Sequence, residues 1–150
     1  MIKLNKKFLV KGAISTDLVK DEINSLNTDS MGAHSIFLGQ VRADSIDGKM
    51  VKLIEYSAYE EMVQKELEKI FSDISTRYDD LQKIIIMHSI GQVKAGEYSL
   101  FVFVGAGHRK NVFSALDDIV KQIKKRLPVW KKEILQDSSY VWTENEKIID

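Results

Sequence analysis

The chain contains no cysteine among its 150 residues. This absence excludes a disulfide, a thiolate nucleophile and a cysteine-based metal site. If the protein takes part in sulfur chemistry, the sulfur must therefore come from another molecule. The segment Met1–Lys7 also lacks the apolar block of a secretory signal peptide, so we expect a cytoplasmic location.

Long apolar runs, repeats and linkers are also missing, and Pro128 is the only proline. No run approaches the roughly 20 apolar residues that a membrane-spanning helix needs, so we expect no membrane partner. The 22 basic and 22 acidic side chains give a net charge of zero, which argues against a generally polyanion-binding surface. We therefore predict one domain, residues 1–150, with a core of its own.

The spacing of apolar residues predicts an α+β domain with three main helices and a largely antiparallel sheet. Helices are expected at 15–26, 58–77 and 110–126, and strands at 2–10, 32–41, 51–56, 83–89, 98–104 and 141–142. Asp47-Gly48 supplies hairpin-turn chemistry within a connection that is longer than a tight turn. A second turn is expected from Gly91 to Glu97. Pro128 should end the last helix, because the residue before a proline is disfavoured in the helical region.

Cations concentrate between Gly105 and Lys132 of this neutral chain. This segment carries eight basic residues against two acidic ones, a local surplus of six positive charges. Such a surplus in a neutral protein indicates a site for an anion. The basic residues are Arg109, Lys110, Lys121, Lys124, Lys125, Arg126, Lys131 and Lys132.

His108 and Arg109 follow the small-residue run 105–107, at the point where a buried strand passes into a helix. Small residues allow the backbone to approach a ligand, and the free N–H groups at the start of a helix favour a phosphate or a carboxylate. Arg109 can add a bidentate clamp. The alternative, of nearly equal weight, is a solvated loop with a helix-capping histidine.

Lys124 and Lys131 lie on either side of Pro128, so the chain can turn there and aim both at one place. A lysine held near other cations gives up its proton more readily and can serve as a base or a nucleophile. The alternative for most of these cations is the solvated face of an amphipathic helix. Trp130 is suited to stacking on a flat ligand, and equally to a core or an interface.

Arg42 ends an apolar strand beside the loop 43–49, where it can reach into a site, although exposed arginines at strand ends are common. Glu55 can orient a nearby cation, with a surface acid as the stronger alternative. His34 and His88 are interpreted as strand residues, and neither has a second ligand at metal spacing, so no metal site is expected.

Taken together, these segments resemble the large, catalytic subunit of molybdopterin synthase. The resemblance spans roughly residues 10–143 and follows the order of the family's motifs. Its strongest part is the His-Arg pair combined with two lysines that flank Pro-x-Trp. The matching segments are 32–42, 53–62, 88–97, 108–115 and 124–133.

The resemblance implies an α/β-hammerhead-type fold and a sulfurtransferase activity. Members of the family convert cyclic pyranopterin monophosphate into molybdopterin by installing two sulfurs as a dithiolene. The sulfur comes from the C-terminal thiocarboxylate of a small ubiquitin-like subunit that ends in Gly-Gly. Large subunits form a central dimer within a heterotetramer. No cofactor is expected beyond these substrates, and molybdenum itself is not expected to bind.

The resemblance also implies roles for single residues. Lys124 would be the essential catalytic lysine, and Lys131 a second catalytic or substrate-orienting lysine; both would contact substrate. Arg42, His108 and Arg109 would bind the phosphate and the pterin. The sequence departs from the family where Ser89 stands in place of a frequent basic residue, and in its acidic stretch after Trp142.

Two alternatives stay open at this point. The basic segment of the chain suits a nucleic-acid-binding module, although the predicted strands lack an exposed aromatic stacking pattern. A scaffold that has kept the fold and lost turnover is the other alternative. The joint presence of the five predicted site residues argues against that second alternative.

Overall fold

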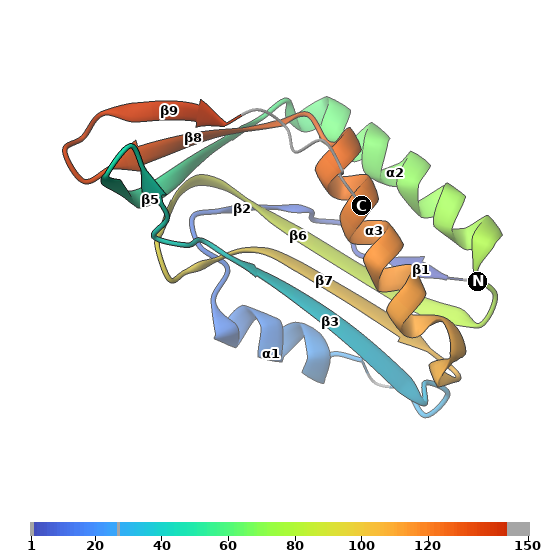
Figure 1. Ribbon diagram of the computed structural model, residues 1–150. Helices are drawn as coiled ribbons and strands as arrows, with labels where there is room; N and C mark the ends of the chain where they lie inside the picture. Colours follow the sequence, from blue (N-terminus) through green and yellow to red (C-terminus); the bar gives the residue numbers. More distant parts are fainter. Residues whose placement is uncertain (1, 27, 144–150) are drawn as a thin grey trace.

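The computed structural model describes residues 2–26 and 28–143. These residues form one sheet of nine strands with three α-helices (Figure 1), as the α+β interpretation predicted. The acidic stretch after Trp142 falls largely on 144–150, which lie outside the described residues, and so does the end of the predicted domain. No helix in the described part of the chain is long and apolar enough to cross a membrane.

The sheet has the strand order β3-β7-β6-β5-β8-β9, and every pair along this path is antiparallel. Two short strands, β1 and β2, add to β6 in parallel, and β4 pairs with β5. The bounds are β1 Lys3–Leu4, β2 Leu9–Lys11, β3 Ala33–Gln40, β4 Ser45–Ile46, β5 Lys49–Ala58, β6 Leu81–Lys94, β7 Tyr98–Ala106, β8 Val129–Leu135 and β9 Tyr140–Thr143.

Strand β6 is the longest, and it exchanges one neighbour for another along its length. Its residues up to Ile90 pair with β1 and β2, whereas Gly91 to Lys94 pair with β5. The change of neighbour occurs at Gly91, where φ is 83°, a conformation that favours glycine. The prediction of a turn beginning at Gly91 was therefore wrong, because the strand continues to Lys94.

The predicted strand over 2–10 is in fact two strands. The side chain of Asn5 takes the place of backbone pairing, because its Oδ1 accepts from the N–H of Ile86 at 2.9 Å and its Nδ2 donates to the Ile86 carbonyl at 2.8 Å. Asp47-Gly48 forms a hairpin turn, as predicted: both residues have positive φ, and they make a tight turn between β4 and β5. This turn lies within the longer connection from β3 to β5, also as predicted.

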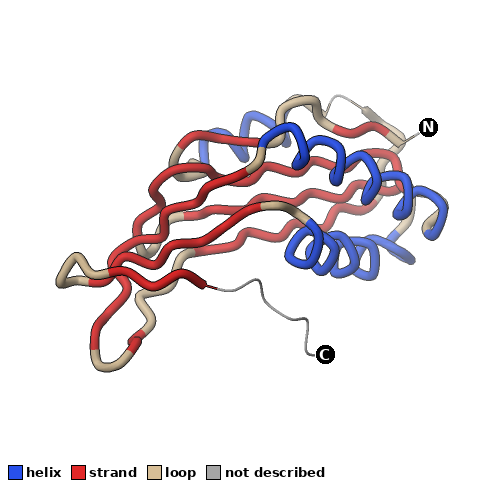
Figure 2. The backbone as a smooth tube through the Cα atoms, turned by 90° about the horizontal axis from the view of Figure 1, so that it is seen from above, coloured by secondary structure: helices blue, strands red, loops and turns tan. Residues whose placement is uncertain are grey.

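The helices cover both faces of the sheet. Helix α1 (Thr16–Asn24) packs on one face, and α2 (Glu60–Arg77) and α3 (Val112–Arg126) pack on the other (Figure 1). Ser15 caps α1 by accepting from the N–H of Leu18 at 3.1 Å. Figure 2 shows that the β4–β5 and β8–β9 hairpins extend past the helices at one end of the molecule.

Pro128 ends α3, as predicted, and the chain then enters strand β8 between β5 and β9. The sequence analysis did not identify β8, because its centre is the charged run Lys131-Lys132-Glu133. The strand nevertheless alternates across the sheet, so Lys131 and Glu133 share one face and Trp130 and Lys132 the other.

Candidate functional site

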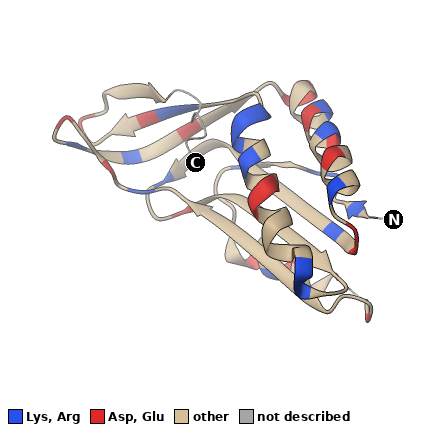
Figure 3. Cartoon of the chain, turned by 45° about the vertical axis from the view of Figure 1, so that its right-hand side comes forward, with Lys and Arg blue, Asp and Glu red and all other residues tan. Residues whose placement is uncertain are grey.

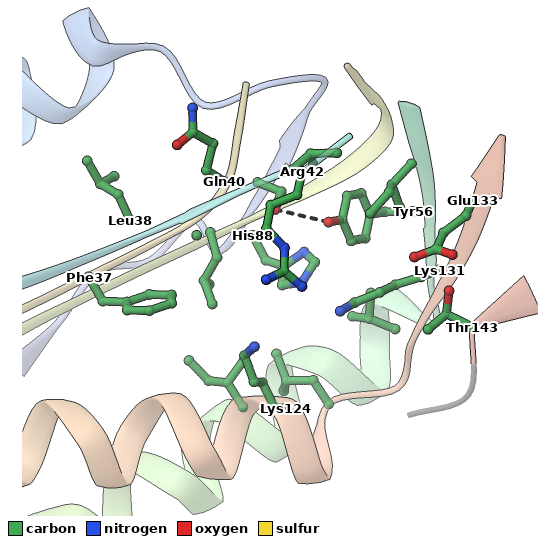
Figure 4. Close-up of a pocket in the computed structure, with 18 of the residues that line it drawn as sticks. Phe37, Leu38, Gln40, Arg42, Tyr56, His88, Lys124, Lys131, Glu133 and Thr143 are labelled. Carbon is green, nitrogen blue, oxygen red and sulfur yellow. Dashed lines mark hydrogen bonds between the residues drawn. The ribbon is translucent and has the colours of Figure 1, made fainter. Parts of the chain in front are cut away.

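A pocket of about 500 Å³ lies where the C-terminal end of α3 faces the sheet. Strands β3, β5, β6, β7 and β8 and the segment after β3 all contribute to its walls (Figure 4). The apolar part of the lining is Phe37, Leu38, Val41, Ile54, Leu100, Ile123, Leu127 and Val129. The polar part is Gln40, Arg42, Asp44, Tyr56, His88, Ser99, Lys124, Lys131, Glu133 and Thr143.

Three predicted site residues, Arg42, Lys124 and Lys131, meet in this pocket. They come from three different segments of the chain, and Figure 4 shows their nitrogen-bearing ends pointing into the same space. Because α3 stops before Pro128 and β8 starts at Val129, the chain reverses there and both lysines reach one pocket. Three cationic side chains in a partly apolar pocket make a binding site for an anion.

Arg42 is the most accessible of the three. Its side chain is 81% exposed, and its guanidinium lies 3.2 Å from the carboxylate of Asp44. An exposed ion pair of this kind contributes at most about 1 kcal/mol. Arg42 can therefore break its ion pair with Asp44 and bind an incoming anion at a small cost in free energy.

His88 forms part of the pocket wall, and the sequence analysis placed it only as a strand residue. Burial, reinforced by the nearby charge of Lys131, lowers the pKa of His88 to about 4. Its Nδ1 lies 2.7 Å from the carbonyl oxygen of Ser89, and its ring meets the edge of Tyr56 with centroids 5.2 Å apart. A single histidine among the apolar residues of β6 was the signal in the sequence.

Tyr56, Ser99 and Glu133 are further pocket residues that sequence reasoning missed. The hydroxyl of Tyr56 donates to Ser99 Oγ at 3.0 Å, and burial raises the pKa of the Tyr56 phenol. Glu133 shares a face of β8 with Lys131, so a carboxylate stands beside the cations. Glu55, which was considered as a group that orients a cation, is not part of the pocket lining. It lies in register with Lys132 of the neighbouring strand β8.

His108 and Arg109 lie away from the pocket, at the other end of α3. At a rise of about 1.5 Å per residue, α3 is about 22 Å long, so one chain cannot bring this pair to Lys124. His108 is held by Asp80, whose Oδ2 accepts from the backbone N–H at 2.7 Å and lies 3.0 Å from the ring Nδ1.

The basic segment is thus divided into two ends with acidic residues between them (Figure 3). Part of its charge is structural, because Arg126 contacts Glu66 at 3.3 Å and Asp73 at 2.8 Å. Lys121 pairs with Asp117 at 3.1 Å. This arrangement differs from the continuous basic stripe that a nucleic-acid-binding module would present.

Trp130 is 48% exposed and is not part of the pocket lining, so it does not wall a ligand there. Among the residues that the structure describes, no three His, Cys, Asp or Glu side chains are placed to hold a metal ion. The groups that this pocket offers are three cations, two carboxylates, one amide, one imidazole and hydroxyls. This set suits an anionic ligand that also carries hydrogen-bonding groups.

Comparison with known proteins identifies the family. The family model described as MoaE protein matches residues 11–126. The chain belongs to the MoaE protein family. Within this family, the chain is 37% identical over 129 residues to the molybdopterin synthase catalytic subunit of Pyrococcus abyssi, covering 86% of this chain and 85% of the relative.

The relative from Drosophila pseudoobscura pseudoobscura bears the same name and is 41% identical over 128 residues. That match covers 85% of this chain but 35% of the fly protein, so the chain spans about a third of the length of the fly relatives. The fold of the MoaE family is shared with solved structures. Molybdopterin synthase from Staphylococcus aureus superposes with a TM-score of 0.81 at 28% identity, covering 92% of this chain and 96% of that one.

A second solved structure is the complex of subunits 1 and 2 of the molybdopterin-converting factor from Helicobacter pylori. It superposes with a TM-score of 0.76 at 21% identity, covering 94% of this chain and 90% of that one. At this identity the likeness establishes the fold. Family membership therefore rests on the family model and on the relative from Pyrococcus abyssi.

Proposed function

We propose that this protein is the catalytic subunit of a molybdopterin synthase. It would transfer sulfur from the thiocarboxylate of a small ubiquitin-like subunit to cyclic pyranopterin monophosphate. The observation that carries the proposal is the meeting of Arg42, Lys124 and Lys131 in one pocket of a MoaE-family chain. Both substrates are anions, and both are large enough to need a pocket with apolar walls.

The pocket supplies the electrostatics that such a transfer needs. In net terms, each transfer replaces one carbon–oxygen bond of the pterin side chain by a carbon–sulfur bond. The carbon–sulfur bond of the thiocarboxylate is broken and replaced by a carbon–oxygen bond, with the oxygen supplied by the substrate or by water, so that the small subunit ends in a carboxylate. Negative charge develops on oxygen during this exchange, and preorganised cations stabilise it. We assign Lys124 to the incoming thiocarboxylate, Lys131 to catalysis or orientation of the substrate, and Arg42 to the phosphate.

His108 and Arg109 are proposed to bind the phosphate and the pterin, but α3 keeps them about 22 Å from Lys124 within one chain. Their proposed role therefore requires a second copy of the chain. This agrees with the proposed central dimer of large subunits. Mixing a Lys124→Ala chain with an Arg109→Ala chain tests it, because one pocket of the mixed dimer would regain both residues and therefore activity.

The proposed partner is a small ubiquitin-like subunit with a Gly-Gly end, in a heterotetramer around the central dimer. The solved complex of two subunits from Helicobacter pylori, which has the same fold, supports a two-subunit assembly. The openness of the pocket toward Arg42, whose side chain is 81% exposed, supports entry of an extended tail. Absence of a resident cofactor and a cytoplasmic location stay predictions, the latter to be tested by cell fractionation.

Reconstitution tests the proposed function. The purified chain is combined with the thiocarboxylated small subunit and cyclic pyranopterin monophosphate, and the dithiolene product is followed through its fluorescent oxidised derivative. We expect product with the unmodified chain and with Lys125→Ala, a control in which the exposed lysine next to Lys124 is removed. We expect Lys124→Ala to abolish the product and Lys131→Ala to reduce it strongly.

The other outcomes separate the alternatives. Wild-type turnover by Lys124→Ala would contradict the assignment of this lysine. A stable complex with the small subunit but no product would favour an inactive scaffold. Neither complex nor product would contradict the proposed function as a whole.

A further inference from the structure

The imidazole of His88 is a buried titratable group of the pocket to which the proposed function gives no role. It lies on β6, is 8% exposed, and lines the same pocket as Lys124 and Lys131. Its Nδ1 is 2.7 Å from the Ser89 carbonyl. A carbonyl oxygen can only accept, so Nδ1 carries the proton of the neutral ring and Nε2 has the free lone pair.

Since Nδ1 is engaged by Ser89, Nε2 is the ring nitrogen that remains available to the pocket that His88 lines. Nε2 has no hydrogen-bond partner among the described residues. In the described part of the chain, the enclosed polar side-chain atoms without a partner are Ser89 Oγ and Thr143 Oγ1. Nε2 is not among them, so it is not enclosed by protein atoms. Because the pKa of His88 is lowered to about 4, the ring stays neutral at physiological pH and is a poor base. It is therefore suited to accept a hydrogen bond and not to take up a proton.

An acceptor at this place complements the three cations of the pocket. Arg42, Lys124 and Lys131 can only donate, so they recognise the anionic part of a ligand and nothing that itself donates. A lone pair would repel a phosphate or carboxylate oxygen. The ring of a reduced pterin, in contrast, presents N–H groups, and each needs an acceptor when it is removed from water.

We propose that Nε2 of His88 accepts a hydrogen bond from a ring N–H of the pterin and so fixes the orientation of the heterocycle relative to the phosphate. This inference rests on the proposed function. It makes His88 a residue that determines specificity for the heterocycle, while the three cations hold the anionic groups. His88 would then discriminate between a pterin phosphate and a phosphate alone.

Binding measurements with two probes test this role. Affinities for cyclic pyranopterin monophosphate and for inorganic phosphate are measured by calorimetry for the wild type, His88→Leu, His88→Gln and the control His34→Gln, which alters an exposed histidine on β3. We expect His88→Leu to weaken pterin binding about tenfold or more, the usual effect of removing the partner of a buried donor, and to change phosphate binding less than about twofold.

His88→Gln should recover most of the pterin affinity, because its amide oxygen can accept near the position of Nε2. A measurement on the unmodified chain is independent of whether the variants fold. In a ¹⁵N spectrum, the signal of the unprotonated ring nitrogen of His88 should move upfield when the pterin phosphate binds, and stay in place with inorganic phosphate.

The inference is overturned if His88→Leu binds the pterin as tightly as the wild type, or if it loses pterin and phosphate affinity equally. An unmoved ¹⁵N signal with bound pterin overturns it as well. If the wild type forms product while any of these results is found, the inference alone has failed. If the wild-type chain binds no pterin phosphate, the proposed function fails together with it.

Discussion

His88→Gln is expected to make the protein less sensitive to acid. In the folded chain, burial and then the charge of Lys131 lower the pKa of His88 to about 4, whereas a histidine in the unfolded chain titrates near 6.5. Between these values the unfolded chain binds a proton that the folded chain does not bind. The stability that neutral His88 contributes is therefore present above pH 6.5 and is lost as the pH falls toward 4.

The size of the effect follows from the two pKa values. The difference between them corresponds to about 3 kcal/mol in full, most of which is lost by pH 4.5. Urea titrations at pH 7.5 and pH 4.5 give the free energy of unfolding of each protein. The wild type should lose roughly 2–3 kcal/mol more than His88→Gln between the two pH values, because all other titrating groups are shared.

His34→Gln provides the control, since His34 is exposed and its removal should leave the acid sensitivity of the wild type. Equal losses in the wild type and in His88→Gln would refute the reasoning. That result would mean that His88 takes up a proton in the folded chain as readily as in the unfolded chain, and hence that it is not buried beside Lys131.

Three further changes should lower the free energy of unfolding, measured by urea titration at pH 7.5. Ser15→Ala removes the cap of α1 and should cost about 1 kcal/mol; no loss would contradict the cap. Gly107→Ala places a methyl group 2.5 Å from Asp80 Oδ1 and should cost about 1–2 kcal/mol. The cost of Gly107→Ala should be smaller in a chain that also carries Asp80→Gly, because the carboxylate that the methyl group meets is then absent. Arg126→Met removes the contacts with Glu66 and Asp73 and should cost about 1 kcal/mol, with exposed Lys125→Met as the control.

The helices and the long apolar strands were predictable because their side chains follow one period over many residues. Val63, Leu67, Ile70 and Ile74 repeat along α2, and all four are buried. Strand β8 was not predicted, because its adjacent lysines, Lys131 and Lys132, project from opposite faces of the strand. A count of charges along the sequence cannot show this alternation. The break at Asn5 depends on a contact with Ile86, a residue 81 positions away, and no local pattern contains such information.

The candidate site was predictable in part. Pro128 indicated that Lys124 and Lys131 could approach each other, and the structure places both in one pocket with Arg42. Linear order could not show that α3 separates these lysines from His108, because residues close in sequence lie far apart along a helix axis. His88 and Tyr56 were hidden because pocket and core residues of a strand have the same spacing, and only the packing of α3 distinguishes them.

The junction after α3 has a mechanical consequence. Arg126 is tied to α2, Leu127 is buried, and the carbonyl of Pro128 accepts from the N–H of Tyr59 at the start of α2. The backbones that carry the two pocket lysines are therefore clamped to a second helix, so their separation is set by how α2 and α3 pack. Heating should consequently leave the pocket intact until this helix pair loosens, and loss of the proposed activity should coincide with global melting.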